Sequence, residues 1–264
     1  MRPTRIWLVA GLAGALAALL TLAAFAPASL VDVALRAASN GRVALTEADG
    51  SIWNGSGRLV FVDIASVDAA EAAGSPVLPG VAVPGRLSWD LRKLPLLFGL
   101  IDAQVQLVGM SDTVRLSGHV GELRVAAGRL ALPSVDLGRL GSPWNTIRPA
   151  GSLELRWDGL VFRDNGFEGK AEIDLRGMAS ALTPVRPLGD YRIAVTGDGG
   201  RAGLSIQTLQ GPLRLAGTGT WDARAGVRFE AEASADEAER QRLDAFLGMI
   251  GRRDGDRTII KIGA

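Results

Sequence analysis

Residues 151–175 read GSLELRWDGLVFRDNGFEGKAEIDL, and apolar and polar side chains alternate in two runs, Leu153–Trp157 and Ala171–Leu175. Alternation with a period of two is typical of half-buried antiparallel strands. Asp158-Gly159 and Asn165-Gly166 are turn signals, because Asn, Asp and Gly tolerate a positive φ. The stretch therefore predicts short strands joined by tight turns.

The same pattern extends over most of the chain, which has 34 glycines in 264 residues. Further strand-like runs are Val43–Leu45, Leu59–Val62, Val105–Val108, Val114–Leu116, Leu123–Val125, Tyr191–Val195, Leu204–Ile206, Leu213–Leu215 and Val227–Glu230. Asp198-Gly199-Gly200 gives another turn signal. We predict a mainly β fold, in which a large curved antiparallel sheet forms a half-barrel-like meander.

One helix is predicted near the C-terminus. Ser234 and Glu237 have the spacing of a capping box, and Gly251 is expected to end the helix. Its apolar stripe consists of Leu243, Phe246, Leu247 and Ile250. We expect this short amphipathic helix to cover one end of the sheet; a docking face for a partner is the alternative.

The N-terminal region differs from the rest of the chain. Residues 6–31 carry no ionisable side chain and follow Arg2 and Arg5. About 20 helical residues cross a bilayer, and basic residues flanking a span stay in the cytoplasm. We predict a cytoplasmic tail (1–5), a single-pass inner-membrane anchor (6–26), a juxtamembrane segment (27–40) and a periplasmic β domain (41–264). The alternative is a signal peptide cleaved after Ala24-Phe25-Ala26.

Composition excludes several classes of function. The 29 basic and 28 acidic residues are well mixed, so no basic stripe predicts a nucleic-acid partner. The chain has no Cys and only His119, so thiolate metal sites, multi-His zinc sites and triads with a His base cannot form. We predict that the protein is not an enzyme and has no catalytic, cofactor-binding or metal-binding residues.

Two glycine-containing motifs have only a superficial likeness to ligand-binding loops. The segment 197–203 resembles a phosphate loop, but a strand rather than a helix is expected to follow it, so we predict a hairpin. Asp254-Gly255-Asp256 has the carboxylate spacing of some calcium loops but lacks the remaining oxygen ligands. Neither motif predicts a cofactor.

Two segments interrupt the alternation. Residues 66–84 are rich in Ala, Gly and Pro and are interpreted as an exposed loop. Residues 91–100 are dense in leucine, and Pro95 excludes a regular central strand or helix there. We expect this second segment either to lie across the open end of the sheet or to touch the bilayer.

Tryptophan recurs in four similar settings, interpreted as strands that end in Trp and a turn former. The segments are 50–55, 85–90, 151–159 and 217–222. Trp can simply fill one face of a sheet while Asn or Asp opens the next turn. Duplication of a strand-pair unit is the alternative.

Taken together, the chain resembles the type II secretion system protein N family over nearly its whole length. The resemblance depends on GSIWNG (50–55), PLGDYR (187–192), GPLRLAGTGTW (211–221), and the helix 243–251 followed by RDGD (253–256). It implies a non-catalytic component of the machine that moves folded proteins across the outer membrane, working beside the inner-membrane platform subunit and the secretin. Relative to the family pattern, the 66–84 loop resembles a local insertion.

A second function remains open at this point. Trp89 and the stretch Leu94–Gly99 resemble those of large inner-membrane proteins that have a curved lipid-binding sheet. If the predicted sheet curves into an open half-barrel lined by Val, Leu and Ile, it could act as a lipid carrier or sensor. This is a likeness of fold only.

Overall fold

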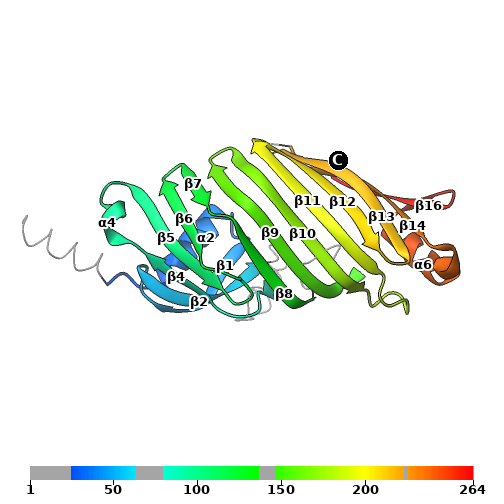
Figure 1. Ribbon diagram of the computed structural model, residues 1–264, viewed down its shortest axis with the longest axis horizontal. Helices are drawn as coiled ribbons and strands as arrows, with labels where there is room; N and C mark the ends of the chain where they lie inside the picture. The colour runs from blue at the N-terminus through cyan, green and yellow to red at the C-terminus, as the bar shows by residue number, and fades with distance from the viewer. Residues whose placement is uncertain (1–24, 63–79, 137–146, 223–224, 264) are drawn as a thin grey trace, which may run out of the picture.

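The computed structural model describes residues 25–62, 80–136, 147–222 and 225–263. These residues form one antiparallel sheet of 16 strands, together with short helices (Figure 1). Along the sheet the order is β1-β2-β4-β5-β6-β7-β9-β10-β11-β12-β13-β14-β16-β15, while β3 pairs with β2 and β8 with β9. The mainly β class and the meander are confirmed, and the sheet is open.

The strands in the first half are β1 (Val43–Gly50), β2 (Asn54–Val62), β3 (Gly80–Ala82), β4 (Leu87–Leu91), β5 (Leu100–Leu107), β6 (Val114–His119), β7 (Glu122–Val125) and β8 (Gly128–Asp136). Those in the second half are β9 (Ala150–Arg163), β10 (Gly166–Ala179), β11 (Gly189–Gly199), β12 (Arg201–Gln210), β13 (Leu213–Asp222), β14 (Gly226–Ala235), β15 (Arg252–Asp254) and β16 (Arg257–Ile262). Every strand-like run quoted above lies wholly or mainly in one of them.

Two of the three turn predictions are confirmed. Asn165-Gly166 connects β9 to β10, and Asp198-Gly199-Gly200 connects β11 to β12. The prediction for Asp158-Gly159 is wrong, because both residues lie inside β9. Gly159 has φ +102°, and here β9 exchanges its partner: Trp157 pairs with Gly128 of β8, and Leu160 pairs with Val125 of β7. The glycine supports a bulge and not a turn.

The predicted loop 66–84 is partly wrong. Residues 63–79 lie outside the described residues, but Gly80–Ala82 form β3, in which Ala82 pairs with Val60 of β2. Val83 continues this contact by donating its N–H to Leu59 O over 2.8 Å. The apolar run Val81-Ala82-Val83 supports this short strand, whose signal is hidden by the surrounding Gly and Pro residues.

The C-terminal helix α6 (Arg240–Ile250) follows a 3₁₀ turn, Glu237–Glu239. The predicted capping box is wrong: Ser234 belongs to β14, where it pairs with Arg214, and no side chain caps the helix. Gly251 is the C-cap, as predicted. Leu243, Phe246 and Leu247 are buried, so the apolar stripe does cover one end of the sheet.

Residues 91–100 contain a single helical turn, α4 (Lys93–Leu96), before β5 begins. Pro95 is compatible with this turn, because the first N–H groups of a helix have no intrahelical acceptor. The segment therefore contains one short helical turn, and neither a central strand nor a longer regular helix.

The predicted juxtamembrane segment (27–40) contains α2 (Ser29–Ala38), which packs against β1. Val31 and Leu35 of α2 contact a small core formed by Ala28, Leu45 and Trp89. Nearly all of the predicted anchor, residues 6–24, lies outside the described residues. Within the part of the chain that the structure describes, no helix has the length and apolar character needed to cross a membrane.

Two of the four tryptophans in the repeated settings occupy equivalent positions in the sheet. Trp89 lies opposite Gly55 and Trp157 opposite Gly128, and each indole covers the glycine. Trp89 Nε1 donates to the carbonyls of Ser51 and Ile52, both at 3.2 Å, and Trp157 Nε1 donates to Ala126 O at 2.7 Å. A large ring over a cross-strand glycine fills the space that a Cβ would occupy.

The interpretation of all four settings as strands that end in Trp is therefore only partly right. Trp53 lies between β1 and β2, and Trp157 lies in the middle of β9. Trp221 is the last residue but one of β13. The shared arrangement of Trp89 and Trp157 over a cross-strand glycine agrees with Trp filling one face of the sheet. The same arrangement is also compatible with duplication of a strand-pair unit.

Candidate functional surfaces of the sheet

The sheet presents one apolar face, which is assembled from rows of directly paired residues. One row runs across eight strands through Leu130, Leu155, Ile173, Ile193, Ile206, Gly217, Ala231 and Ile260. A second row contains Trp157, Ala171, Val195, Leu204, Gly219, Phe229 and Ile262. Because side chains alternate across a strand, this register gathers the apolar set on a single face.

At the C-terminal end, α6 lies over this face and leaves a groove of about 500 Å³ beside it. The helix contributes Phe246, Met249 and Ile250 to the lining. The sheet contributes Leu175, Ile193, Ile206, Leu215, Phe229, Ile260 and Ile262, among others. A concave site with such an apolar lining is suited to an apolar ligand and offers few groups for acid–base chemistry.

With Ser180 and Lys261, Tyr191 is one of the polar residues that line this groove. Its hydroxyl donates to Leu213 O over 3.0 Å, and the side chain is buried. Burial raises the pKa of the phenol far above its ordinary value. Tyr191 is therefore a neutral hydrogen-bonded structural group at physiological pH.

The opposite face is charged, and one of its ion-pair groups is centred on Asp174 of β10. The Asp174 side chain is fully buried beneath two arginines of the neighbouring strands. Arg192 Nε donates to Oδ1 over 2.7 Å, and Arg156 Nη2 donates to Oδ2 over 2.6 Å. The hydrogen bond from Arg192 is the main reason why the pKa of Asp174 is lowered.

Similar carboxylate-centred groups recur along the sheet. Asp102 of β5 accepts from Arg115 at 2.9 Å and from Arg92 at 3.0 Å, and the bond from Arg115 lowers its pKa. Glu122 of β7 is held between Arg124 and Arg163, which likewise lower its pKa. These acids are stably ionised and paired, unlike a general acid poised near neutral pH.

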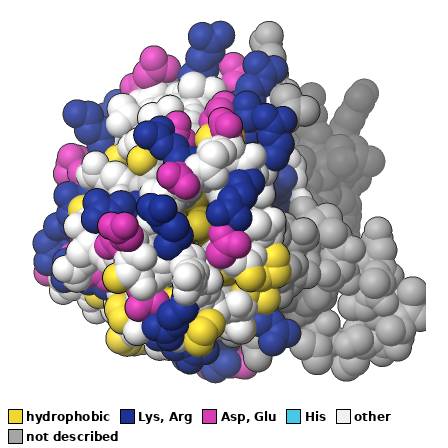
Figure 2. All heavy atoms as spheres, turned by 90° about the vertical axis from the view of Figure 1, so that its right-hand side faces the viewer, with side chains coloured by type: hydrophobic (Ala, Val, Ile, Leu, Met, Phe, Trp, Pro, Cys, Tyr) yellow, Lys and Arg dark blue, Asp and Glu magenta, His cyan; other side chains and the backbone are white. Residues whose placement is uncertain are grey.

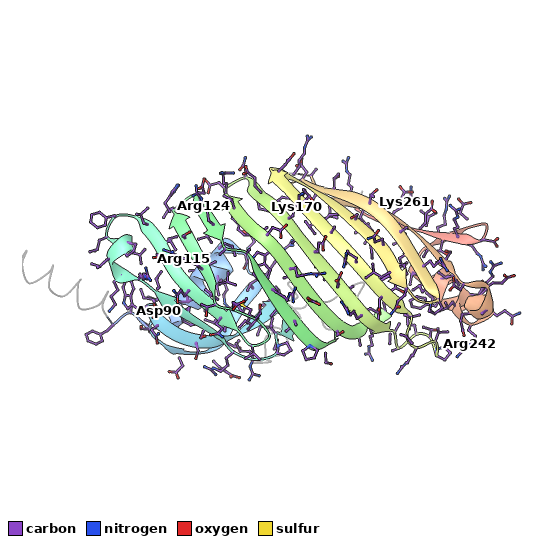
Figure 3. All side chains as sticks on the ribbon, viewed as in Figure 1. Asp90, Arg115, Arg124, Lys170, Arg242 and Lys261 are labelled. Atoms are coloured by element: carbon purple, nitrogen blue, oxygen red, sulfur yellow. The ribbon has the colours of Figure 1, made fainter. Side chains whose placement is uncertain are left out.

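Charges of both signs are spread along the whole molecule. Figure 3 marks Arg115, Arg124, Lys170 and Lys261, which come from β6, β7, β10 and β16. Figure 2 looks onto the C-terminal end and shows Lys and Arg interspersed with Asp and Glu, with hydrophobic side chains in smaller groups. Interspersed charges of this kind favour specific protein contacts over binding to a polyanion.

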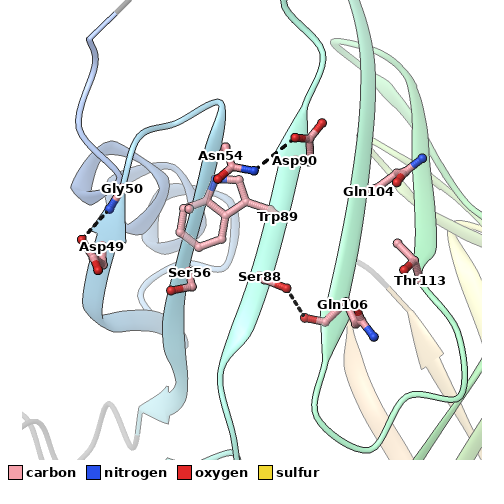
Figure 4. Close-up of a pocket in the computed structure, with 11 residues that line it drawn as sticks. Asp49, Gly50, Asn54, Ser56, Ser88, Trp89, Asp90, Gln104, Gln106 and Thr113 are labelled. Carbon is pink, nitrogen blue, oxygen red and sulfur yellow. Dashed lines mark hydrogen bonds between the residues drawn. The ribbon is translucent and has the colours of Figure 1, made fainter.

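A polar groove of about 460 Å³ lies on the first half of the sheet (Figure 4). It is lined by two cross-strand rows, Asn54-Asp90-Gln104 and Ser56-Ser88-Gln106. Asn54 Nδ2 donates to Asp90 Oδ2 over 3.2 Å, and Ser88 Oγ donates to the Gln106 carbonyl over 3.3 Å. The groove offers amide, hydroxyl and carboxylate groups, the last from Asp49 and Asp90, but no basic side chain.

The other sequence motifs have structural positions. His119 ends β6, is exposed, and its Nδ1 lies 2.8 Å from Val120 O. The segment 197–203 is the predicted hairpin. Asp254-Gly255-Asp256 lies at the turn between β15 and β16. Among the described residues, no three His, Asp or Glu side chains are grouped in a way that could hold a metal ion.

Sequence reasoning named no site residue, and so it missed the groove beside α6. The alternation in β11 and β12 did carry a signal, because Ile193 and Ile206 fall on the same face once the strands pair. The position of α6 decides which part of that face remains open, and the sequence contained no signal for it.

The described residues thus define a class of protein: a large open β-sheet with one apolar and one charged face. Within this class the family can be stated, because the sequence model for "Type II secretion system (T2SS), protein N" matches residues 41–260. The chain belongs to that family, as the resemblance implied, and is a type II secretion component. The family comprises components of secretion machinery and is not a known enzyme family.

No curated protein and no solved structure matches the chain.

Proposed function

We propose that the protein is a non-enzymatic, periplasmic component of the type II secretion system, held by its N-terminal anchor in the inner membrane. In this role it supports the export of folded proteins by binding other parts of the machine. The family match over residues 41–260 is the observation that carries the proposal. The apolar run 6–31 behind Arg2 and Arg5 supports the anchor and its orientation.

The proposed partners are an inner-membrane platform subunit and the secretin. The charged face supports a protein partner, because mixed charges of both signs steer and orient protein association. The N-terminal sheet edge is less suitable, because side chains of α2 and the residue after it already bind two edge amides of β1. Ser39 Oγ accepts from Val43 N at 2.9 Å, and Asp32 Oδ1 accepts from Leu45 N at 2.6 Å.

Deletion of the gene is the direct test. The deletion strain should lose type II substrates from the culture supernatant and retain them in the periplasm, and the full chain supplied in trans should restore export. Unchanged supernatant composition in the deletion strain would contradict the proposal.

A second experiment tests the partners. A photo-crosslinking residue placed at Lys170, on the charged face, should trap a platform subunit or the secretin in cells with the complete apparatus. The matched control carries the same group at Leu204, on the apolar face of the neighbouring sheet region. Recovery of the chain alone from the Lys170 variant would argue against a binding role on this face.

The groove beside α6 favours a second candidate function, a lipid carrier or sensor. Its lining by Ile193, Ile206, Phe229 and Ile262 is suited to an acyl chain. A phospholipid with a photoactivatable acyl chain should label the full chain within β11 or β12. Ile206→Trp fills the groove and should abolish this label, whereas Leu209→Trp, at an exposed position, should keep it. If Ile206→Trp were labelled as strongly as the wild type, the groove would be excluded as the lipid site.

A further inference from the structure

A group of large apolar side chains is exposed around α4, at one end of the sheet. The exposed fractions are 74% for Leu94, 76% for Leu97 and 81% for Phe98. Leu100 is 49% exposed, and its cross-strand partner His119 precedes Val120, which is 89% exposed. We call these five side chains, Leu94, Leu97, Phe98, Leu100 and Val120, the apolar tip. So many adjacent exposed apolar side chains are typical of an interaction surface.

The apolar tip lies close to the place where the described chain begins. Ile52 N–H donates to Ala26 O over 3.0 Å, so Phe25 and Ala26 are fixed beside the β1–β2 connection. The next residue, Trp53, accepts from Leu91 N–H over 2.6 Å, just before α4. Lys93 Nζ, in α4, lies 5.3 Å from the centre of the Trp53 ring. Figure 1 shows α4 and the start of the described chain at the same end of the molecule.

The apolar N-terminal run ends at this same place. Residues 6–26 are the predicted membrane anchor, and Phe25, the first described residue, is 79% exposed. A bilayer that contains this anchor therefore meets the protein within a few residues of Ala26. The apolar tip is then held next to that bilayer by backbone hydrogen bonds and not by a flexible linker.

Charge and aromatic chemistry at the tip agree with a lipid surface. Arg92 is the N-cap of α4 and Lys93 is its first residue, and Trp53 lies beside Lys93. Basic and aromatic side chains are enriched at membrane interfaces. Carboxylates on nearby strands are already engaged: Asp90 with Asn54, Asp102 with Arg92 and Arg115, and Glu122 with Arg124 and Arg163. The charges of Asp102 and Glu122 are offset by their arginine partners, which lowers the cost of approaching anionic lipid.

We propose that the apolar tip inserts into the outer leaflet of the membrane that holds the anchor, so that the sheet contacts that membrane at two points. This inference rests on the anchor of the proposed function. Side chains at such a contact are expected about 5–10 Å into the headgroup and acyl boundary. Two contacts fix the tilt of the sheet, whereas a single span would let the domain swing.

The absence of Cys from the chain makes the test direct, because one introduced Cys can be labelled selectively. Phe98→Cys in the full chain, labelled with an environment-sensitive fluorophore, is reconstituted into phosphatidylethanolamine and phosphatidylglycerol vesicles. The label should shift to shorter wavelength, and spin-labelled lipids should quench most of its emission. Arg242→Cys, on α6 at the opposite end of the sheet, is the matched control and should show neither effect (Figure 3).

Two further measurements distinguish insertion of the apolar tip from membrane attachment by the anchor. Flotation of the unlabelled full chain with the vesicles reports the anchor alone. If the chain floats and the label at position 98 behaves like the label at position 242, the apolar tip does not insert and the inference is overturned, while the anchor stands. If the chain does not float, both are overturned. Leu94→Ser with Leu97→Ser should reduce the quenching at position 98 without affecting flotation.

Discussion

Asp174 is the residue around which the charged face of the sheet is ordered. Its side chain is fully buried, while Arg156 and Arg192 remain about one-third exposed. A buried carboxylate is stable only when its oxygens are paired, and removing its charge takes away the anion that the two guanidinium groups share. Asp174 is therefore important to the stability of β9, β10 and β11.

Asp174→Asn should lower the free energy of unfolding by about 2 kcal/mol at pH 7, a figure reduced for the partial exposure of the two arginines. Denaturant unfolding of the detergent-solubilised full chain, followed by tryptophan fluorescence, measures this. Glu230→Gln is the control, because Glu230 and Lys261 form an exposed pair and such pairs contribute little. Equal effects of both substitutions would contradict the special role of Asp174.

The pH dependence of this difference has a definite sign. The folded-state pKa of Asp174 lies below the ordinary value of an aspartate, chiefly because Arg192 donates a hydrogen bond to its carboxylate. A lowered folded pKa contributes stability that is fully present above the unfolded pKa and is lost as the pH falls toward the folded pKa. The stability difference between wild type and Asp174→Asn should therefore be constant near neutral pH and shrink below about pH 4.

Gly128 is a second residue with a specific structural role. A Cβ at this position would overlap the indole of Trp157, with Cε2 at 2.9 Å. Gly128→Val should destabilise the protein by about 1–3 kcal/mol, because the ring is fixed by its bond to Ala126 O and cannot move aside. Gly200→Ala is the control, since its Cβ would meet only Asn165 O at 3.5 Å. Near-ultraviolet circular dichroism should report the displaced indole.

At the scale of elements, α6 is held by its apolar stripe. Leu243 is completely buried against the core that contains Leu213 and Ala233. Leu243→Ala should cost about 3–4 kcal/mol in unfolding free energy, as large-to-small changes at buried leucines do. Gln241→Ala, at an exposed position of the same helix, should leave stability nearly unchanged. Hydrogen exchange of α6 amides should increase in the first variant only.

The elements also show how far the sequence could predict the fold. Period-two alternation identified β9 to β14 correctly, because a half-buried strand needs one apolar side chain in two. Alternation could not identify the bulge at Asp158-Gly159, since the same residue pair suits a turn, and the exchange of β8 for β7 depends on tertiary pairing. The capping box failed because the Ser234 position was taken by strand pairing with Arg214.

The candidate surfaces were predictable to a smaller extent. Alternation implied one apolar and one polar face, and the helical spacing of Leu243, Phe246 and Leu247 implied that α6 covers part of the apolar face. The opening of the groove depends on where α6 docks, which no local pattern encodes. The arginine groups around Asp102 and Asp174 arise from cross-strand register, so single strands contain no signal for them.

At the scale of the whole molecule, an open sheet must protect its edges. Asp32 and Ser39 bind the edge amides of Leu45 and Val43, which prevents another strand from pairing there. The double change Asp32→Ala with Ser39→Ala should cause concentration-dependent self-association, measured by analytical ultracentrifugation in detergent. Thr46→Ala removes an exposed hydrogen bond to Arg58 O, and this control variant should show the same association state as the wild type. A monomeric double variant would show that α2 alone blocks this edge.

The order of strands has a mechanical consequence. β1 and β15 lie at opposite edges of the sheet, so a pull applied between the two ends of the chain acts across the strands. The hydrogen bonds of antiparallel ladders run in that same direction, perpendicular to the strands. Tension in this direction would therefore break the hydrogen bonds between two strands one after another, which requires only a low force. The same sheet would resist a shearing load along its strands much more strongly, because all the bonds between two strands would have to break together.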